Sequence, residues 1–323
     1  MDKLFDVVAL GEAMLEFNQT RPGRPQYLQD FGGDTSNAAI AAARAGVRSA
    51  YLTRVGADPF GKALLDLWKR EGVNIIAVER DTHAATGIYF VTHCASGHEF
   101  SYLRTGSAAS RMTPLWLGAP TPKATDKPAS PADVIGAARI LHLSAISLAI
   151  SIDACDTAFA AMALAQAAGT RVSFDSNLRL KLWPLARAQA CIEKAVAQCD
   201  IFLPSLEDMV TLTGLTEPDK VVNWSHAHGA PIVVLKLGAD GALVSDGQRK
   251  LHVKARTVTV VDATGAGDCF CGNLLARMAL GDDVFAASHY ANAAAALAVQ
   301  AYGAVGPLPT AAQVLGTMTT AVP

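Results

Sequence analysis

The segment Asp262-Ala-Thr-Gly-Ala-Gly-Asp268 lies between an apolar run and a helix-forming stretch. Gly265, Ala266 and Gly267 have little or no side chain, so the backbone can approach a ligand closely. Their N–H groups are expected at a helix N-terminus, where unpaired donors and the helix dipole favour an anion such as phosphate. Asp268 would repel that phosphate, but it could accept the proton of a hydroxyl group that attacks phosphorus. Alternatively Asp268 is only a helix-capping acid, and the motif alone leaves both interpretations open.

A second glycine-containing segment, residues 31–38, precedes another expected helix. Gly33 follows a further glycine, and such a pair lets the backbone meet a small ligand. Asp34 and Asn37 carry the donors and acceptors that a sugar requires. Taken alone, the segment is better explained as an ordinary loop-to-helix turn that is capped by Ser36.

A third candidate is an antiparallel hairpin, which two β-rich runs and a short Ala-Ser-Gly turn predict within residues 87–104. If its loop comprises residues 94–97, Tyr89 faces Tyr102, and Arg104 shares the face of Tyr102. A three-residue loop would flip one strand and break this grouping. Two phenols and a guanidinium on one face suit a polyol acid, whereas the alternative is a merely solvated face.

The fourth candidate segment, residues 174–183, begins at the carboxyl end of an expected strand. Ligands bind at this edge in open α/β sheets. Arg179 could hold a carboxylate through two parallel hydrogen bonds. Arg179 and Lys181 are equally well explained as solvated loop cations.

Other chemical signals in the sequence are negative. Residues 56–62 match the GxxxxGK spacing of a phosphate-binding loop. However, Ala63 replaces the hydroxyl residue that would bind Mg²⁺, and Pro59 lacks one of the backbone N–H groups that would bind phosphate. We therefore expect an ordinary strand-to-helix turn here. The sequence contains no Gly-x-Gly-x-x-Gly after a strand, no Gly-x-Ser-x-Gly and no His-Glu-x-x-His. Its six cysteines form no Cys-x-x-Cys pair and are too sparse for a disulfide scaffold.

Charge and hydropathy narrow the class of protein. Lys and Arg total 27 against 29 Asp and Glu, so the net charge of −2 gives no support for nucleic-acid binding. The first residues do not resemble a secretory signal, and no run of 18 apolar residues predicts a membrane span. We therefore expect a cytoplasmic enzyme or binding protein with no nucleic-acid or membrane partner.

Strand-like and helix-like stretches alternate along most of the chain, which predicts right-handed βαβ units on a parallel sheet. The expected strands are Leu4–Leu10, Ala50–Val55, Val73–Val78, Arg139–Ser144, Arg171–Asp175, Asp200–Leu203, Pro231–Lys236 and Val258–Val261. The expected helices follow the N-caps Ser36 and Asp58 or cover 153–168, 185–198, 267–280 and 283–301. Five prolines between Pro114 and Pro131 predict an exposed loop. Residues 12–33 and the hairpin lack a helix pattern and look like an insertion into one three-layer α/β domain.

Taken in their order along the chain, the four segments resemble those of the PfkB (ribokinase-like) carbohydrate kinases, and the resemblance covers nearly the whole chain. Val55-Gly56-x-Asp58-x-Phe60-Gly61 and the Asp262–Asp268 signature carry the resemblance together with the glycine pair. It implies a Rossmann-like three-layer α/β/α fold with a small β-sheet lid. The α/β core would comprise residues 1–11, 35–83 and 113–323, and the lid residues 12–34 and 84–112. The resemblance also implies ATP as donor, Asp268 as catalytic base, and an anion hole made by Gly265, Ala266 and Gly267.

Within that family the chain is most similar to the branch that phosphorylates 2-keto-3-deoxygluconate. The similarity rests on Gly32-Gly-Asp-Thr35, Tyr102-x-Arg104 and Asp175-x-Asn177-x-Arg179. It implies transfer to the terminal C6 hydroxyl, which would face Asp268. Added to Asp34 and Asn37, the residues that it implies for substrate binding are Gly33, Tyr89, Tyr102, Arg104 and Arg179. The alternatives are a fructokinase or another PfkB sugar kinase, or a non-catalytic sugar or nucleotide sensor on the same fold.

The resemblance also assigns a nucleotide side to the site. It implies that ATP contacts Ser205, Lys236, Gly238, Asn292 and Gly303. The family's Asn-x-x-Glu, tied to Mg²⁺, appears here as Ser205-Leu-Glu-Asp208, so Asp208 would act on the metal through water. Asp262 occupies a position at which some relatives bind K⁺, which makes K⁺ an additional candidate ion. We also expect a homo-oligomer.

Overall fold

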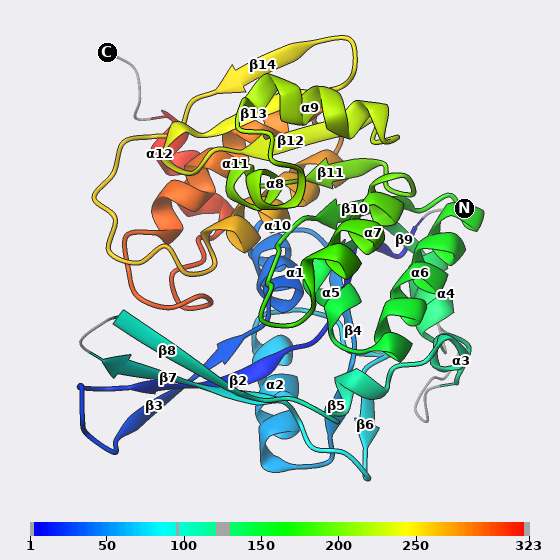
Figure 1. Ribbon diagram of the computed structural model, residues 1–323, viewed down its shortest axis with the longest axis vertical. Coiled ribbons are helices and arrows are strands. Elements are labelled where there is room, and N and C mark those ends of the chain that lie inside the picture. Colours follow the sequence, from blue (N-terminus) through cyan, green and yellow to red (C-terminus); the bar gives the residue numbers. More distant parts are fainter. Residues whose placement is uncertain (1–2, 95–96, 121–129, 320–323) are drawn as a thin grey trace.

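The structure of the protein is a computed structural model that describes residues 3–94, 97–120 and 130–319. An eight-stranded sheet forms the centre of the molecule (Figure 1). The strand order is β14-β13-β12-β11-β10-β9-β1-β4. These strands are β1 (Phe5–Leu10), β4 (Ser49–Leu52), β9 (Ala138–Ser144), β10 (Arg171–Asp175), β11 (Ile201–Leu203), β12 (Ile232–Lys236), β13 (Ala242–Ser245) and β14 (Lys250–Val253). The strands from β4 to β12 are parallel, and β13 and β14 add an antiparallel hairpin at one edge.

Helices cover both faces of this sheet because its strands are apolar on both sides. In β1, Val8 and Leu10 pack into one core while Val7 packs into the other. The first core is covered by α3 (Pro114–Leu117), α4 (Pro131–Gly136), α5 (Ala145–Ala149), α6 (Ile152–Ala167), α7 (Leu185–Val196), α8 (Leu206–Thr213) and α9 (Pro218–Ala227). The opposite core is covered by α1 (Asp34–Arg44), α10 (Ala266–Ala279) and α11 (Val284–Ala298). The predicted three-layer α/β/α fold is confirmed.

A separate four-stranded sheet extends from the lower part of the core in Figure 1. Its order is β3-β2-β7-β8, with β2 (Met14–Gln19), β3 (Tyr27–Gly32), β7 (Ile88–Cys94) and β8 (Gly97–Leu103). These strands lie inside the ranges 12–34 and 84–112 expected for a lid. Tyr89 pairs with Tyr102, so the predicted register is confirmed, while residues 95 and 96 of the turn lie outside the described residues.

Helix α2 supports the four-stranded sheet, and a few short elements complete the fold. The Phe17 ring of β2 meets the Phe60 ring of α2 (Pro59–Arg70) at 5.9 Å, so the four-stranded sheet rests on this helix. Asp58 caps α2 by accepting from the Gly61 N–H at 2.7 Å, which confirms the strand-to-helix turn expected at residues 56–62. β5 (Arg54–Gly56) pairs with β6 (Glu79–Asp81), and α12 (Ala311–Thr319) is the last helix described.

None of the helices in the described ranges is long and apolar enough to cross a membrane.

Two expected strands are wrong. Val73–Val78 makes a single bridge, between Asn74 and Ala50, because the Asn74 side chain accepts from the Ile76 N–H and turns the chain away from the sheet. Val258–Val261 forms no strand, since the N–H of Val261 donates to the Val299 carbonyl at the end of α11 and Val260 is 60% exposed.

Three further expectations at element ends also differ. The expected strand Ala50–Val55 is divided into β4 and β5. The N-cap of α1 is Gly33, because the Ser36 hydroxyl instead accepts from the buried Trp68 indole. The loop expected from Pro114 to Pro131 begins with α3 and ends at α4, while residues 121–129 lie outside the described part of the chain.

Candidate active site

Asp268 and Asn37 meet where α10 packs on α1. The approach is close because Gly272 has no side chain: a Cβ there would lie 2.3 Å from the Ala38 carbonyl oxygen. At this crossing the Asn37 Nδ2 donates to Asp268 Oδ2 at 2.9 Å. Two segments separated by 231 positions in the sequence thereby share one site.

The surroundings of Asp268 make its carboxylate more basic than usual. Burial, reinforced by the neighbouring Asp34 carboxylate, raises the pKa of Asp268 to about 7. The hydrogen bond from Asn37 opposes this rise because it stabilises the charged form. A carboxylate with a pKa near neutrality is suited to accept a proton at physiological pH.

The N-terminus of α10 presents free backbone donors beside Asp268. Gly265 precedes the helix with φ of 73° and packs against Ala304, where a Cβ would lie 3.1 Å from three of its atoms. In the described part of the chain, the N–H groups of Gly265 and Gly267 have no protein acceptor, whereas the Ala266 N–H donates to the Ala263 carbonyl at 3.2 Å. Two of the three amides expected in the anion hole are therefore available to a ligand.

Polar side chains from the carboxyl ends of neighbouring strands surround this helix end. The Lys236 ammonium, at the end of β12, lies 2.7 Å from both Asp175 carboxylate oxygens. Asn177, just after β10, donates to Asp34 Oδ2 at 2.7 Å. The predicted residues Asp34 and Lys236 thus have partners, Asn177 and Asp175, to which the sequence analysis gave no separate role.

The segment that follows β11 carries Ser205, expected at the nucleotide, and Asp208, expected to act on the metal. The Ser205 hydroxyl accepts from the Asp208 N–H at 3.1 Å and caps α8. The Ser176 hydroxyl donates to Asp208 Oδ2 at 2.7 Å and accepts from the Ser205 N–H at 3.1 Å. No group of three or more His, Cys, Asp or Glu side chains is arranged for a metal within the residues described.

Of the remaining nucleotide-side residues, Gly238 and Gly303 lie on loops and Asn292 lies in α11. Gly238 has φ of 60° and begins a 3₁₀ turn. Asn292 donates to the Val253 carbonyl at 2.8 Å, so its amide fixes the end of β14. The Gly303 N–H donates to Asp262 at 2.9 Å, and Asp262 also accepts from the Thr264 hydroxyl at 2.7 Å. The Asp262 carboxylate therefore joins the start of the signature to the Gly303 turn.

In the four-stranded sheet, the Tyr89 and Tyr102 rings lie 5.6 Å apart on one face. Gly33, with φ of 126°, enters the helix beside this sheet, where a Cβ would lie 2.7 Å from the Glu12 carbonyl oxygen. The Tyr89 hydroxyl donates to Glu16. Tyr102 is 40% exposed, so the aromatic face remains open to solvent at this side.

The two arginines expected at the substrate differ in their surroundings. Arg104 is 10% exposed and forms an ion pair with Glu12, which is 1% exposed. Ser107 also donates to Glu12, at 2.6 Å. Arg179 is exposed and its Nη1 donates only to the adjacent Leu178 carbonyl, at 2.8 Å. The Arg104 charge is already neutralised by the protein, whereas that of Arg179 is not.

The loop that carries Arg179 approaches the aromatic face. The Lys181 ammonium lies 5.8 Å from the centre of the Phe100 ring on β8. Burial raises the pKa of Tyr102, and the nearby charges of Arg104 and Arg179 oppose that rise. Arg179 is therefore close enough to Tyr102 to influence the pKa of its hydroxyl.

Sequence reasoning gave no separate role to Glu12, Asp175 and Asn177. Each follows or ends a parallel strand, Glu12 near the end of β1 and the other two at the end of β10. Polar residues at these ends are the signal that would have indicated them, because ligands of open α/β sheets bind there.

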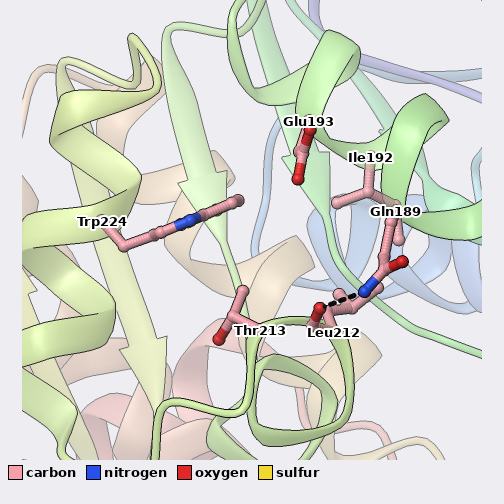
Figure 2. Close-up of a pocket in the computed structure, with 6 residues that line it drawn as sticks. All are labelled: Gln189, Ile192, Glu193, Leu212, Thr213 and Trp224. Atoms are coloured by element: carbon pink, nitrogen blue, oxygen red, sulfur yellow. Dashed lines mark hydrogen bonds between the residues drawn. The ribbon is translucent and has the colours of Figure 1, made fainter. Parts of the chain in front are cut away.

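Two hollows lie away from this cluster. Figure 2 shows a cavity of about 10 Å³ between α7, α8 and α9, which is large enough for about one water molecule. It is lined by Gln189, Ile192, Glu193, Leu212, Thr213 and Trp224. A second, open hollow of about 290 Å³ lies at the start of α2 and includes Asp58 and Asp81, which are already hydrogen-bonded within the fold. Neither hollow contains Asp268.

Comparisons with known proteins identify the family of the chain. The sequence pattern of the pfkB family carbohydrate kinases matches residues 4–311. The chain is 32% identical over 318 residues to the 2-dehydro-3-deoxygluconokinase of Thermoproteus tenax, which covers 96% of this chain and 93% of that protein. It is 32% identical over 324 residues to the probable fructokinase-4 of Arabidopsis thaliana, with 95% of each covered.

A solved structure shows the same architecture. The fructokinase of Vibrio cholerae O395, crystallised with fructose, ADP and calcium, superimposes with a TM-score of 0.82 at 30% identity, covering 96% of this chain and 98% of that one. The family signature, the fold and the grouping of Asp268, Asn37 and the free amides of α10 agree, and the chain therefore belongs to the pfkB family of carbohydrate kinases.

Proposed function

We propose that this protein transfers the terminal phosphoryl group of ATP to the C6 hydroxyl of 2-keto-3-deoxygluconate, also named 2-dehydro-3-deoxygluconate. The observation that carries the choice of substrate is Arg179, an exposed guanidinium beside Tyr102 that belongs to no ion pair among the described residues. A sugar acid supplies the missing carboxylate, and a neutral ketose does not.

In this proposal Asp268 is the general base. It accepts the proton of the C6 hydroxyl as that oxygen attacks phosphorus, and its pKa of about 7 leaves a large fraction ionised at neutral pH. Asn37 holds one carboxylate oxygen in place, so the other oxygen is directed to the substrate. Asp34 and the Tyr89–Tyr102 face would bind the sugar hydroxyls.

The residues at the end of α10 fit a triphosphate. Gly265 and Gly267 offer free N–H donors, and the Lys236 ammonium lies beside the same helical turn. A Mg²⁺ ion bound to ATP would neutralise phosphate charge, and it needs only one or two protein carboxylates. Asp208 is our candidate, acting through water, because it lies in the first turn of α8, just after β11, where its carboxylate is held by Ser176.

A fructokinase is the second candidate, and one observation favours it. Arg104, which was expected to contribute a second cation, is paired with Glu12 and is nearly buried. Of the two arginines, Arg179 is therefore the one left to select for a carboxylate. If Arg179 served the phosphates or the loop instead, nothing else in the polar face would disfavour a ketose.

The test is Arg179→Ala assayed on 2-keto-3-deoxygluconate and on fructose, with ADP release as the measurement. A charge-assisted hydrogen bond is worth about 1.5–3 kcal/mol, so kcat/KM for the sugar acid should fall roughly ten- to hundredfold while that for fructose changes little. The matched control is Arg80→Ala, which removes another exposed arginine from β6. Equal losses on both sugars would assign Arg179 to the phosphates or the fold, and a wild-type preference for fructose would favour the fructokinase.

A further inference from the structure

The ion pair between Asp175 and Lys236 is largely enclosed by the protein. Asp175 ends β10 and Lys236 ends β12, with β11 between them. The Lys236 Nζ lies 2.7 Å from each Asp175 oxygen, and the side chains are only 14% and 5% exposed. Both carboxylate oxygens hold one ammonium, which fixes its position more firmly than a single contact would.

The ammonium in this pair is charged. Burial alone would lower the pKa of Lys236, but its anionic surroundings, Asp175 first among them and Asp208 in addition, together raise that pKa. The Cys271 sulfur lies 3.7 Å from Lys236 Nζ and 3.4 Å from Asp175 Oδ2. Burial keeps that thiol neutral by raising its pKa well above the usual value, so Asp175 is the anion that compensates Lys236.

Lys236 also lies against the anion site. A Cβ on Gly267 would be 3.7 Å from the Lys236 Nζ, so the ammonium is adjacent to the first turn of α10. The N–H of Gly267 is one of the two free donors there. A lysine side chain on its own has four flexible bonds, and the position of its charge depends on a partner.

We propose that Asp175 is a positioning residue, which holds the Lys236 ammonium beside Gly267 so that the charge is in place for the phosphoryl group during transfer. This inference rests on the proposed kinase activity but not on the identity of the sugar. A charge placed before the reaction costs no reorganisation as negative charge shifts in the transition state. Asp175 itself touches neither sugar nor phosphate in this arrangement and acts through Lys236.

The competing explanation is that the pair only stabilises the fold. Removing one partner of a buried ion pair leaves an uncompensated charge and lowers stability whatever the role of the pair. Loss of activity in a single variant is therefore insufficient. The experiment must measure kcat per folded site and ask whether the effects of the two residues depend on each other.

The test compares Asp175→Asn, Lys236→Met and the double variant. Calorimetric titration with ADP gives the fraction of binding-competent protein, and kcat is normalised to that fraction. Lys236→Met should lower kcat by about 10²–10³-fold, the usual cost of one preorganised donor. Asp175→Asn should lower kcat by about ten- to hundredfold, as is usual for a residue that orients such a group, and leave KM for the sugar within about twofold.

The decisive measurement is the normalised kcat of the double variant. If Asp175 acts through Lys236, adding Lys236→Met to Asp175→Asn should lower normalised kcat far less than Lys236→Met does alone, because groups that act as a unit are not additive. Losses that multiply would overturn the proposal, as would an Asp175→Asn variant with unchanged normalised kcat. Asp175→Glu, which keeps the carboxylate, should recover part of the activity.

Two controls keep this outcome separate from the proposed substrate. Asp219→Asn removes the partner of Lys250 from an exposed ion pair of 2.6 Å on α9 and β14, and it should leave kcat unchanged. The kinetics use whichever sugar the wild-type protein phosphorylates most efficiently. Failure of the sugar-acid assignment would then leave the test of Asp175 intact.

Discussion

Replacing Asn37 with alanine tests whether its hydrogen bond sets the basicity of Asp268. Asn37 is 4% exposed and its Nδ2 donates to Asp268 Oδ2 at 2.9 Å. This bond stabilises the ionised carboxylate, so its loss should raise the pKa of Asp268 above its value of about 7. A hydrogen bond to a charged group is worth about 1.5 kcal/mol or more, which corresponds to roughly one pKa unit.

The expected consequence is a pH-dependent loss of activity. With a shift of about one unit, the ionised fraction of Asp268 at pH 7 falls from about one half to about one tenth, so kcat/KM falls roughly fivefold there and recovers near pH 9. The measurement is kcat/KM from pH 5.5 to 9.5, because its acid limb reports the base of the free enzyme. Asn223→Ala, at an exposed position of α9, is the matched control.

A different result would assign Asn37 to the substrate instead. If its amide contacted only the sugar, KM would rise by a similar factor at every pH and the acid limb would not move. An acid limb that stayed in place, or moved to lower pH, would refute the argument that Asn37 stabilises the Asp268 carboxylate.

Two further predictions concern stability together with activity. Asp268→Asn should lower kcat by about 10²–10⁴-fold with ADP binding retained, and a variant with more than half of the wild-type kcat would exclude Asp268 as base. Because burial raises the pKa of Asp268 from 3.8 to about 7, ionisation of this group opposes folding increasingly as the pH rises between these values. The free energy of urea unfolding of Asp268→Asn should therefore exceed that of the wild type at pH 8, and by a smaller margin at pH 5. Gly272→Ala places a Cβ 2.3 Å from the Ala38 carbonyl oxygen, which should force α1 and α10 apart, lower the free energy of unfolding by about 1–3 kcal/mol and reduce kcat. The control Gly316→Ala, in α12, adds a Cβ that meets no described atom within 4 Å apart from its own helix backbone, and a loss of stability there equal to that of Gly272→Ala would contradict the packing argument.

Local sequence signals predicted the elements whose structure is decided locally. Asp58 followed by Pro59 predicted the start of α2, and a hairpin loop assumed at residues 94–97 predicted that Tyr89 faces Tyr102. Apolar runs were less reliable, because an apolar sequence does not by itself provide the hydrogen-bond partners of a sheet. Val73–Val78 turns at Asn74, and Val258–Val261 is held by the end of α11. The first error arises from a bond within the segment, between the Asn74 side chain and the Ile76 N–H, and the second from a distant partner, the Val299 carbonyl.

The candidate site divides in the same way. Asp268 and the free amides of α10 were predictable, because the positive end of a helix and its unpaired donors belong to the local segment. The contact between Asn37 and Asp268 depends on how closely α1 and α10 pack, which no local pattern specifies. The same holds for Asp175 with Lys236, whose strands are separated by a third strand.

The arginines show why residue type alone cannot assign a substrate. Arg104 and Arg179 supported a sugar acid by the same argument, yet Glu12 neutralises the first in a nearly buried pair. Separating Arg104 from Glu12 would leave an unpaired buried charge, which is energetically costly. We therefore expect Arg104 to remain paired with Glu12, where it connects the end of β8 with the end of β1. Discrimination then rests on one exposed guanidinium, and one charge-assisted contact provides about ten- to hundredfold selectivity. A kinase built this way should prefer the sugar acid while retaining measurable activity on a ketose of similar length.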